Sequence, residues 1–383
     1  MHIEIIKQMK RTTLIIIVFI VGLLFTTCNK TGKDKEFVKK VQLNQETIAV
    51  GIYRATGYEY NSINLIAEAL KIDAGIVYVT LTDADVLKTK LENIDVIIFP
   101  EIENGQIIDQ LDDELAEIFK NFISKKGAIA LCNGSCIMLK AQDCQTLDLV
   151  DLNFEKDSMN NSLLSRTSFN LNENGEKIFP ELKGYKDLYM DKCDNNIVET
   201  DTLKGNKILG FMSNSETANP IFITSKFNSG KIFISNTHPE TTPGMRWMIP
   251  RIVRWVYNQE FIFYNKKVFR PDYYTNELIF DDEKAKKLQK LELQLEKGKK
   301  DEVIEAMDEL EKFSPYLVAE KIRHLLAEKN NEIKLRAAKF LVDIEYTLAI
   351  EDLKKVIKTE RSKKVKEQLN LYLYDLEGML EQN

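Results

Sequence analysis

Ala128-Ile129-Ala130-Leu131-Cys132-Asn133-Gly134-Ser135 is an apolar run that ends in a cysteine and a small-residue turn. The run predicts a buried strand, and the following Cys136-Ile137-Met138-Leu139 predicts the first turns of a helix. A strand-cysteine-helix corner holds the sulfur at the carboxyl edge of a sheet, where the dipole of the next helix favours thiolate over thiol. Gly134 has no Cβ and therefore permits the sharp turn. We predict that Cys132 is a nucleophile.

A second apolar run, Ile232-Phe233-Ile234-Ser235, leads into Asn236-Thr237-His238-Pro239-Glu240. The other histidines, His2 and His324, lie in the leader and in a predicted C-terminal helix, so His238 is the candidate base of the sheet domain. The proline keeps His238 out of the helical region, and residues two apart in an extended segment point the same way. Glu240 can therefore orient the imidazole. A nucleophile, a base and an orienting carboxylate are what covalent acyl chemistry requires.

The motif Cys132-Asn133-Gly134 followed by His238-Pro239-Glu240 resembles the class I glutamine amidotransferase superfamily, whose triad is a cysteine on a nucleophile elbow and a later His-x-Glu. The most similar branch is the domain found at the N-terminus of some biotin–protein ligases, and the resemblance covers about residues 47–260. It implies a flavodoxin-like sheet and a catalytic triad of Cys132, His238 and Glu240.

The resemblance also implies an oxyanion hole. The backbone N–H of Asn133 is one expected donor, and the loop after Pro100, at Glu101 and Ile102, is expected to supply the second. Glu101 and Ile102 stand where the family has two glycines, and Ala130 stands where its elbow usually has a glycine.

Each half of the motif also has a simpler interpretation. An unpaired cysteine often behaves as a small apolar residue in a buried corner. His238-Pro239-Glu240 can equally form a loop held by a local ion pair. Together, in the family's order and each at the end of a strand, the two halves favour the triad.

Strands alternate with helices before Cys132, which is typical of an α/β fold whose parallel sheet is covered by helices on both faces. The predicted strands span 47–53, 75–81, 94–99 and 128–131, and the predicted helices span 63–70, 83–91 and 112–124. Short strands and polar turns between about Leu147 and Ser229 predict an antiparallel extension of the sheet. Ligands bind such sheets at the carboxyl ends of the strands. We therefore expect Tyr58 and Glu59 to lie at the rim of the site.

The N-terminus reads as a targeting segment. Lys7, Lys10 and Arg11 precede an apolar run, Leu14 to Phe25, that is too short to span a bilayer as a helix. Phe25-Thr26-Thr27-Cys28 resembles a bacterial lipobox, which predicts a lipidated Cys28. A plain signal peptide and an uncleaved anchor are the alternatives.

This interpretation divides the first part of the chain into a lipoprotein signal peptide, 1–28, and a polar tether, 29–45. It predicts a membrane-anchored lipoprotein of the cell envelope, facing the periplasm or the exterior, whose membrane contact is the lipid on Cys28. In an oxidising compartment Cys132, Cys136, Cys144 and Cys193 allow three pairings, among which the sequence does not choose. A bridge through Cys132 would silence the nucleophile.

The rest of the chain divides into the glutamine amidotransferase-like domain, 46–262, a linker, 263–283, and a helical domain, 284–383. The last region is rich in Lys, Glu and Leu. Apolar positions in 331–341 recur about 32 residues later, which resembles HEAT-type helical repeats. Such repeats usually offer a surface to a protein partner. A plain helical bundle is the alternative.

Composition limits the classes of function. The 53 basic and 59 acidic residues give a net charge of -6 without a long basic block, which excludes nucleic acid as an expected partner. The sequence implies no cofactor and no metal site.

The sequence leaves two hypotheses for function. The first is a membrane-tethered cysteine hydrolase of amide bonds with an unknown small-molecule or peptide ligand. A glutamine-fed synthase is disfavoured because we expect no acceptor domain. The second is a catalytically silent binding or scaffold lipoprotein that acts through its helical repeats.

Overall fold

The computed structural model describes residues 47–54, 60–101, 111–140, 146–156, 166–193, 195–198, 205–212, 219–264, 266, 268–271, 282–313 and 315–380. The predicted signal peptide, the tether and Cys28 lie outside these residues. Among the described residues, no helix combines the length and the apolar character that a membrane span needs.

The first part of the α/β region alternates strands and helices, as predicted. In chain order its elements are β1 (Ile48–Tyr53), α2 (Tyr60–Leu70), β2 (Ile76–Leu81), α3 (Asp83–Thr89), β3 (Val96–Phe99), α4 (Asp113–Ile123), β4 (Gly127–Leu131) and the 3-10 helix η2 (Cys132–Ile137). Strands β1, β3 and β4 are buried along their whole length, which agrees with their near-continuous apolar sequences.

The second part contains short strands and then one helix. Its elements are β5 (Asn153–Lys156), β6 (Arg166–Leu171), α5 (Glu173–Ile178), the 3-10 helix η3 (Pro180–Leu182), β7 (Leu188–Asp191), β8 (Asn195–Val198), β9 (Lys207–Met212), β10 (Pro220–Phe227), β11 (Gly230–Ser235) and α6 (Met248–Tyr257).

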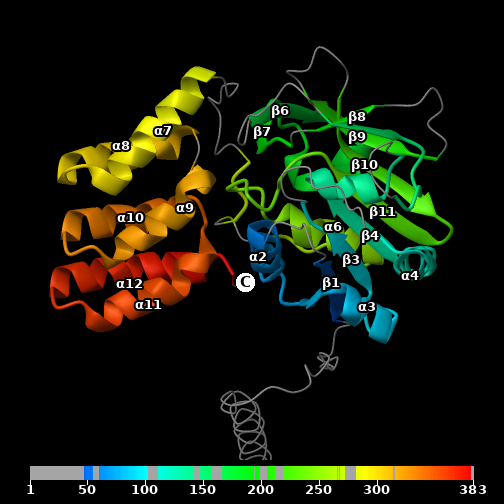
Figure 1. The fold of residues 1–383 in the computed structure, drawn as a ribbon, viewed down its shortest axis with the longest axis horizontal. Helices are drawn as coiled ribbons and strands as arrows, with labels where there is room; N and C mark the ends of the chain where they lie inside the picture. The colour runs from blue at the N-terminus through cyan, green and yellow to red at the C-terminus, as the bar shows by residue number, and fades with distance from the viewer. Residues whose placement is uncertain are drawn as a thin grey trace, which may run out of the picture. The chain divides into compact units, whose positions relative to one another are not determined.

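Nine strands of the described chain form one mixed sheet in the order β2-β1-β3-β4-β11-β10-β9-β6-β7 (Figure 1). The strands from β2 to β11 in this order are parallel to their neighbours, and β10, β9, β6 and β7 continue the sheet in antiparallel pairing. Two predictions are therefore confirmed: a parallel core, and an antiparallel extension of the same sheet. β5 and β8 pair separately.

Helices cover both faces of the parallel part. Helix α2 contacts α6, and α3 contacts α4. The chain moves in one direction along the sheet from β1 to β2 and in the other from β2 through β3 to β4, so right-handed crossovers place α2 and α3 on opposite faces. Helix α4 illustrates the local cause: Asp112 caps it by accepting the Leu115 N–H at 2.8 Å, and its buried stripe of Leu115, Phe119 and Ile123 faces the sheet.

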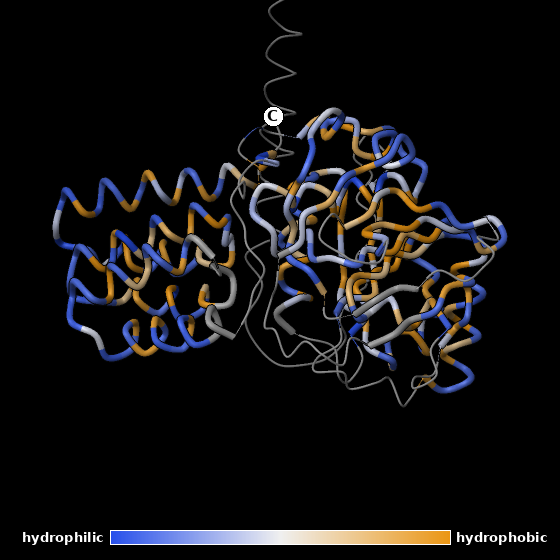
Figure 2. The backbone as a smooth tube through the Cα atoms, turned by 90° about the horizontal axis from the view of Figure 1, so that it is seen from above, coloured by the Kyte–Doolittle hydropathy of each residue, from blue (hydrophilic) through white to orange (hydrophobic). Residues whose placement is uncertain are grey.

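The described C-terminal region consists, as predicted, of helices, which short turns connect. Its elements are α7 (Asp282–Lys297), α8 (Lys300–Phe313), α9 (Pro315–His324), η4 (Leu325–Ala327), α10 (Asn331–Asp343), η5 (Thr347–Ala349), α11 (Ile350–Thr359) and α12 (Lys363–Glu377). Figure 1 shows these helices stacked in pairs, and Figure 2 shows hydrophobic and hydrophilic residues alternating along each of them. The predicted apolar face of α10, which includes Ile333, Ala337 and Leu341, is buried.

A buried carboxylate joins the helical region to the α/β region. Glu345, 0% exposed, accepts the Gly244 N–H at 3.1 Å and two N–H groups of Arg270 at 3.1 and 2.7 Å. The buried Arg246 donates to the backbone carbonyl of Glu345. Arg270 lies within the predicted linker, where Val268 is buried. This linker segment therefore takes part in packing, although the predicted domain boundaries themselves stay predictions.

We predict that Glu345→Ala lowers the free energy of unfolding by about 3 kcal/mol, because it leaves the partly buried Arg270 guanidinium and the Gly244 N–H without the buried carboxylate that accepts from them. Urea unfolding measures the loss. The matched control is Glu367→Ala, whose exposed carboxylate faces Lys363 at 3.9 Å and whose removal changes stability by less than about 0.5 kcal/mol. Equal effects of the two variants would contradict the role of Glu345.

Candidate functional site

Cys132 lies at a strained corner at the carboxyl end of β4. Its φ is 50°, in the left-handed region that residues with a Cβ rarely adopt. Strained backbone of this kind persists only where the surrounding structure enforces it, and it concentrates at functional sites. The side chain is 0% exposed.

The helix after Cys132 is not the one that the sequence predicted. The chain forms the 3-10 helix η2, which begins at Cys132 itself, and no α-helix follows in the described residues up to 140. The carbonyls of Ile137 and Met138 accept N–H groups from residues 147, 149 and 150, so they are engaged outside any continuing helix. The predicted stabilisation of the thiolate by an α-helix dipole is therefore wrong.

A Cβ at Gly134 would clash, as predicted, but the cause is close approach to another segment rather than a sharp turn at this residue. The left-handed residue of the corner is Cys132, whereas Gly134 lies against the end of β3. A Cβ on Gly134 would overlap the carbonyl oxygen of Pro100 and would lie 2.7 Å from that of Phe99. The missing side chain thus permits close approach between η2 and the segment that carries Glu101.

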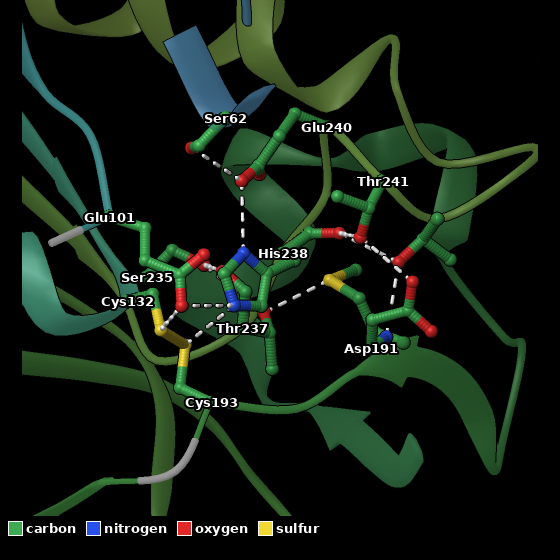
Figure 3. A network of polar contacts seen from close by, with 12 residues as sticks. Ser62, Glu101, Cys132, Asp191, Cys193, Ser235, Thr237, His238, Glu240 and Thr241 are labelled. Atoms are coloured by element: carbon green, nitrogen blue, oxygen red, sulfur yellow. Dashed lines mark hydrogen bonds and ion pairs between the residues drawn. A yellow bond between two sulfur atoms is a disulfide. The ribbon is translucent and has the colours of Figure 1, made fainter. Parts of the chain in front are cut away.

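His238 and Glu240 form the predicted pair at the end of β11. His238 Nδ1 lies 2.9 Å from Glu240 Oε1, and the side chains are 2% and 0% exposed (Figure 3). The hydroxyl of Ser62 donates to the same carboxylate oxygen at 3.5 Å. Glu240 Oε2 is buried without a hydrogen-bond partner among the described residues. Because Glu240 occupies Nδ1, the ring presents Nε2 to the sulfur atoms.

Cys193 completes the site. The structure pairs Cys132 with Cys193 in a disulfide, and Cys193 Sγ lies 3.5 Å from His238 Nε2 (Figure 3). Cys136 is buried and takes no part in a disulfide, and Cys144 lies outside the described residues. A backbone bridge between Lys192 and Thr237 brings the end of β7 to the His238 loop. The sequence left this disulfide pairing open, and because the disulfide runs through Cys132 it blocks the nucleophile.

Glu101 enters the site through its side chain. Its Oε1 lies 3.6 Å from Cys132 Sγ and 3.7 Å from His238 Nε2, whereas the sequence predicted only a backbone contribution from this residue. Burial alone lowers the pKa of His238, but the negative charges of Glu101 and Glu240, aided by the bond to Glu240 and by Asp191, raise it to about 10. The imidazole is therefore protonated at neutral pH.

Several predicted site residues stand apart from this cluster. Tyr58, Glu59 and Ile102 lie outside the described residues. Asn133 follows Cys132 within η2 and is partly exposed. The structure thus joins Cys132, His238 and Glu240, adds the side chains of Glu101 and Cys193, and leaves the roles of Asn133 and Ile102 as predictions.

No family model and no curated protein matches this chain. Some solved structures are distantly similar to this chain. A β-galactosidase from Bacillus circulans sp. alkalophilus has 10% identity and a TM-score of 0.37, over 56% of this chain and 32% of its own. A cytoplasmic protein from Salmonella typhimurium has 11% identity and a TM-score of 0.34, over 55% of this chain and 98% of its own. The chain spans about a third of the length of the β-galactosidase, and such distant likenesses assign neither a fold family nor an activity.

We predict that Gly134→Ala lowers the free energy of unfolding by about 2 kcal/mol, because the new methyl group meets backbone atoms that cannot rotate away. Urea unfolding measures this. Gly205→Ala is the matched control: nothing lies near its Cβ, and the positive φ alone costs about 1 kcal/mol. A Gly134→Ala protein as stable as the unsubstituted chain would show that η2 and Pro100 are not in close contact.

Proposed function

We propose that this chain is a membrane-tethered cysteine hydrolase of amide bonds, related to the class I glutamine amidotransferases, whose active form is reduced at Cys132. The observation that carries the proposal is the left-handed Cys132 at the carboxyl end of β4, beside an imidazole that a buried carboxylate orients at 2.9 Å. The parallel strand order β2-β1-β3-β4-β11 supports a flavodoxin-like sheet, whose ligands bind at this edge.

The reaction begins with reduction of the disulfide. Two thiol groups of a reductant exchange with it, which yields the free thiols of Cys132 and Cys193 and one disulfide of the reductant. The Cys132 thiolate then attacks the amide carbonyl carbon, and His238 gives its proton to the departing amine. Water hydrolyses the resulting thioester, with His238 as the base, and returns the thiolate.

Electrostatics support part of this scheme and oppose another part. A protonated His238 favours the thiolate form of a neighbouring cysteine, as in thiolate–imidazolium pairs. The carboxylate of Glu101 at 3.6 Å from the sulfur has the opposite effect, and it disfavours a developing oxyanion nearby. A productive substrate therefore has to displace this carboxylate or use it to hold a positively charged group. Asn133 is the proposed backbone donor to the oxyanion.

A second candidate follows from the burial of the site. Cys132 is 0% exposed and His238 is 1% exposed, so in the disulfide form no substrate reaches the sulfur. A protein with this site closed would act as a binding or scaffold lipoprotein through its helical region. The stacked pairs from α7 to α12 support HEAT-like repeats, which commonly recruit protein partners.

We predict that iodoacetamide labels Cys132 only after reduction, and that His238→Gln slows labelling at neutral pH by about tenfold because the imidazolium no longer stabilises the thiolate. The protein is reduced with a phosphine in the presence of a chelator, and peptide mass spectrometry gives the rate at each cysteine. Cys136, which is buried in the same short helix, is the internal control. Two results would favour the silent binding protein. One is a Cys132 labelling rate that His238→Gln does not change, and the other is no labelling of Cys132 after reduction.

The lipid anchor has a separate test. We predict that the N-terminal peptide of protein extracted from membranes carries a lipidated Cys28, and that Cys28→Ser moves the protein into the soluble fraction. Mass analysis of the mature N-terminus and fractionation measure the two outcomes. An unmodified Cys28 would remove the tether from the proposal and leave the hydrolase to be judged by thiol reactivity.

A further inference from the structure

We propose that the reduced site binds a zinc ion through Cys132 Sγ, Cys193 Sγ, His238 Nε2 and Glu101 Oε1. The ligand atoms of the two cysteines and the histidine all lie within 4.8 Å of one another, and all three side chains are buried. The inference does not depend on hydrolase activity, and it departs from the absence of a metal that the sequence led us to expect.

The spacing of the donor atoms already fits a tetrahedral ion. Usual zinc–ligand bond lengths place the ligand atoms of a tetrahedral site about 3.6 Å apart for S···N and S···O and about 3.4 Å apart for N···O. The corresponding distances are 3.5 Å from Cys193 Sγ to His238 Nε2, 3.6 Å from Cys132 Sγ to Glu101 Oε1, and 3.7 Å from His238 Nε2 to Glu101 Oε1. Three of the interligand distances are thus in place before any ion enters.

The two sulfur atoms have to separate to about 3.8 Å, the S···S distance across a tetrahedral zinc ion. Their Cα atoms are 5.4 Å apart, so rotation of the two side chains allows this once the disulfide is reduced. Reduction by a thiol reductant supplies two thiols, and zinc binding releases to solvent the two thiol protons and the Nε2 proton of the His238 imidazolium. The disulfide form lacks both thiolates and does not bind the ion.

The surroundings of His238 match those of a metal ligand. A histidine that binds zinc generally donates its other ring N–H to a carboxylate, which fixes the tautomer and orients the ring. Glu240 occupies this place on Nδ1 at 2.9 Å and is itself held by Ser62. Nε2 faces the sulfur atoms, and a bound ion replaces the proton that this nitrogen carries at neutral pH.

The donor set selects the metal class. Two thiolates and an imidazole favour zinc over magnesium or calcium, which prefer sites made of oxygen atoms. The ion would also neutralise two of the three negative charges that the thiolates and Glu101 gather in a buried site. Without it, those charges would have to be relieved by protonation or by the disulfide.

Cobalt(II) titration of the full chain in detergent tests the proposal. We expect the phosphine-reduced, anaerobic protein to bind one Co²⁺, with the thiolate-to-cobalt charge-transfer band and the intense visible bands of tetrahedral coordination, and to lose both when Zn²⁺ is added. The oxidised protein shows neither band. Glu240→Gln, which keeps the shape of the orienting side chain, weakens zinc binding by about 10- to 100-fold. Cys136→Ser, in the same short helix, leaves it unchanged.

Three results would overturn the zinc site: no charge-transfer band in the reduced protein, an equal band in the oxidised protein, or loss of the band in Cys136→Ser. The comparison of reduced with oxidised protein needs no substitution and so does not depend on the folding of a variant. Cys193→Ser separates this proposal from the hydrolase, because it removes a zinc ligand but leaves Cys132, His238 and Glu240 in place. Its metal binding falls, while labelling of its Cys132 reports on the nucleophile alone.

Discussion

Parallel pairing of β4 with β11 is the constraint on which the site depends. The register sets Leu131 opposite Ser235, so Cys132 and His238, which lie about a hundred residues apart in the chain, leave the sheet at the same edge. A shift of one residue in either strand would turn its side chains to the other face and separate the sulfur from the imidazole. The β4–β11 pair in turn lies between β3, which leads to Glu101, and β10, which begins the antiparallel half. The same order of strands therefore brings four of the five side chains of the cluster together, and only Cys193 comes from another part of the sheet.

Burial determines what this cluster can do. His238 has two carboxylates in contact and stays protonated at neutral pH, which is possible inside the protein only because Glu101 and Glu240 balance its charge. The sulfur atoms lie beside the same groups, so their state depends on the charge that the cluster can hold. A disulfide removes the sulfur charge, a single thiolate pairs with the imidazolium, and two thiolates call for a cation. The proposed hydrolase chemistry and the proposed metal binding thus differ in how the negative charge on the sulfur atoms is balanced inside the protein.

The sequence predicted most of the parallel core because its signals are local. Apolar runs bounded by turns identify β1 to β4 and β11, and the Cys132, His238 and Glu240 motif lies at the ends of two of them. The helix after Cys132 was predicted wrongly. The carbonyls of Ile137 and Met138 accept N–H groups from residues 147, 149 and 150, and the periodicity of the sequence does not reveal these hydrogen bonds. The role of Cys193 was also hidden. This role depends on the bridge between Lys192 and Thr237, which the pairing of β7 with β6, and of β6 with β9, places at the His238 loop.

The segment from His238 to Arg246 carries the site at one end and the helical region at the other. Near its start, the Thr242 hydroxyl donates to the His238 carbonyl at 2.7 Å, while the His238 N–H donates to the carbonyl of Asp191 at 2.9 Å. Near its end, Gly244 donates to the buried Glu345. All of these groups are shielded from water, so solvent cannot compensate for a bond that is lost at either end. A partner that displaced Glu345 would therefore act on the same few residues of backbone that hold the imidazole. The proposed binding by the helices and the proposed chemistry at the sheet edge would therefore depend on the same segment, and one would affect the other.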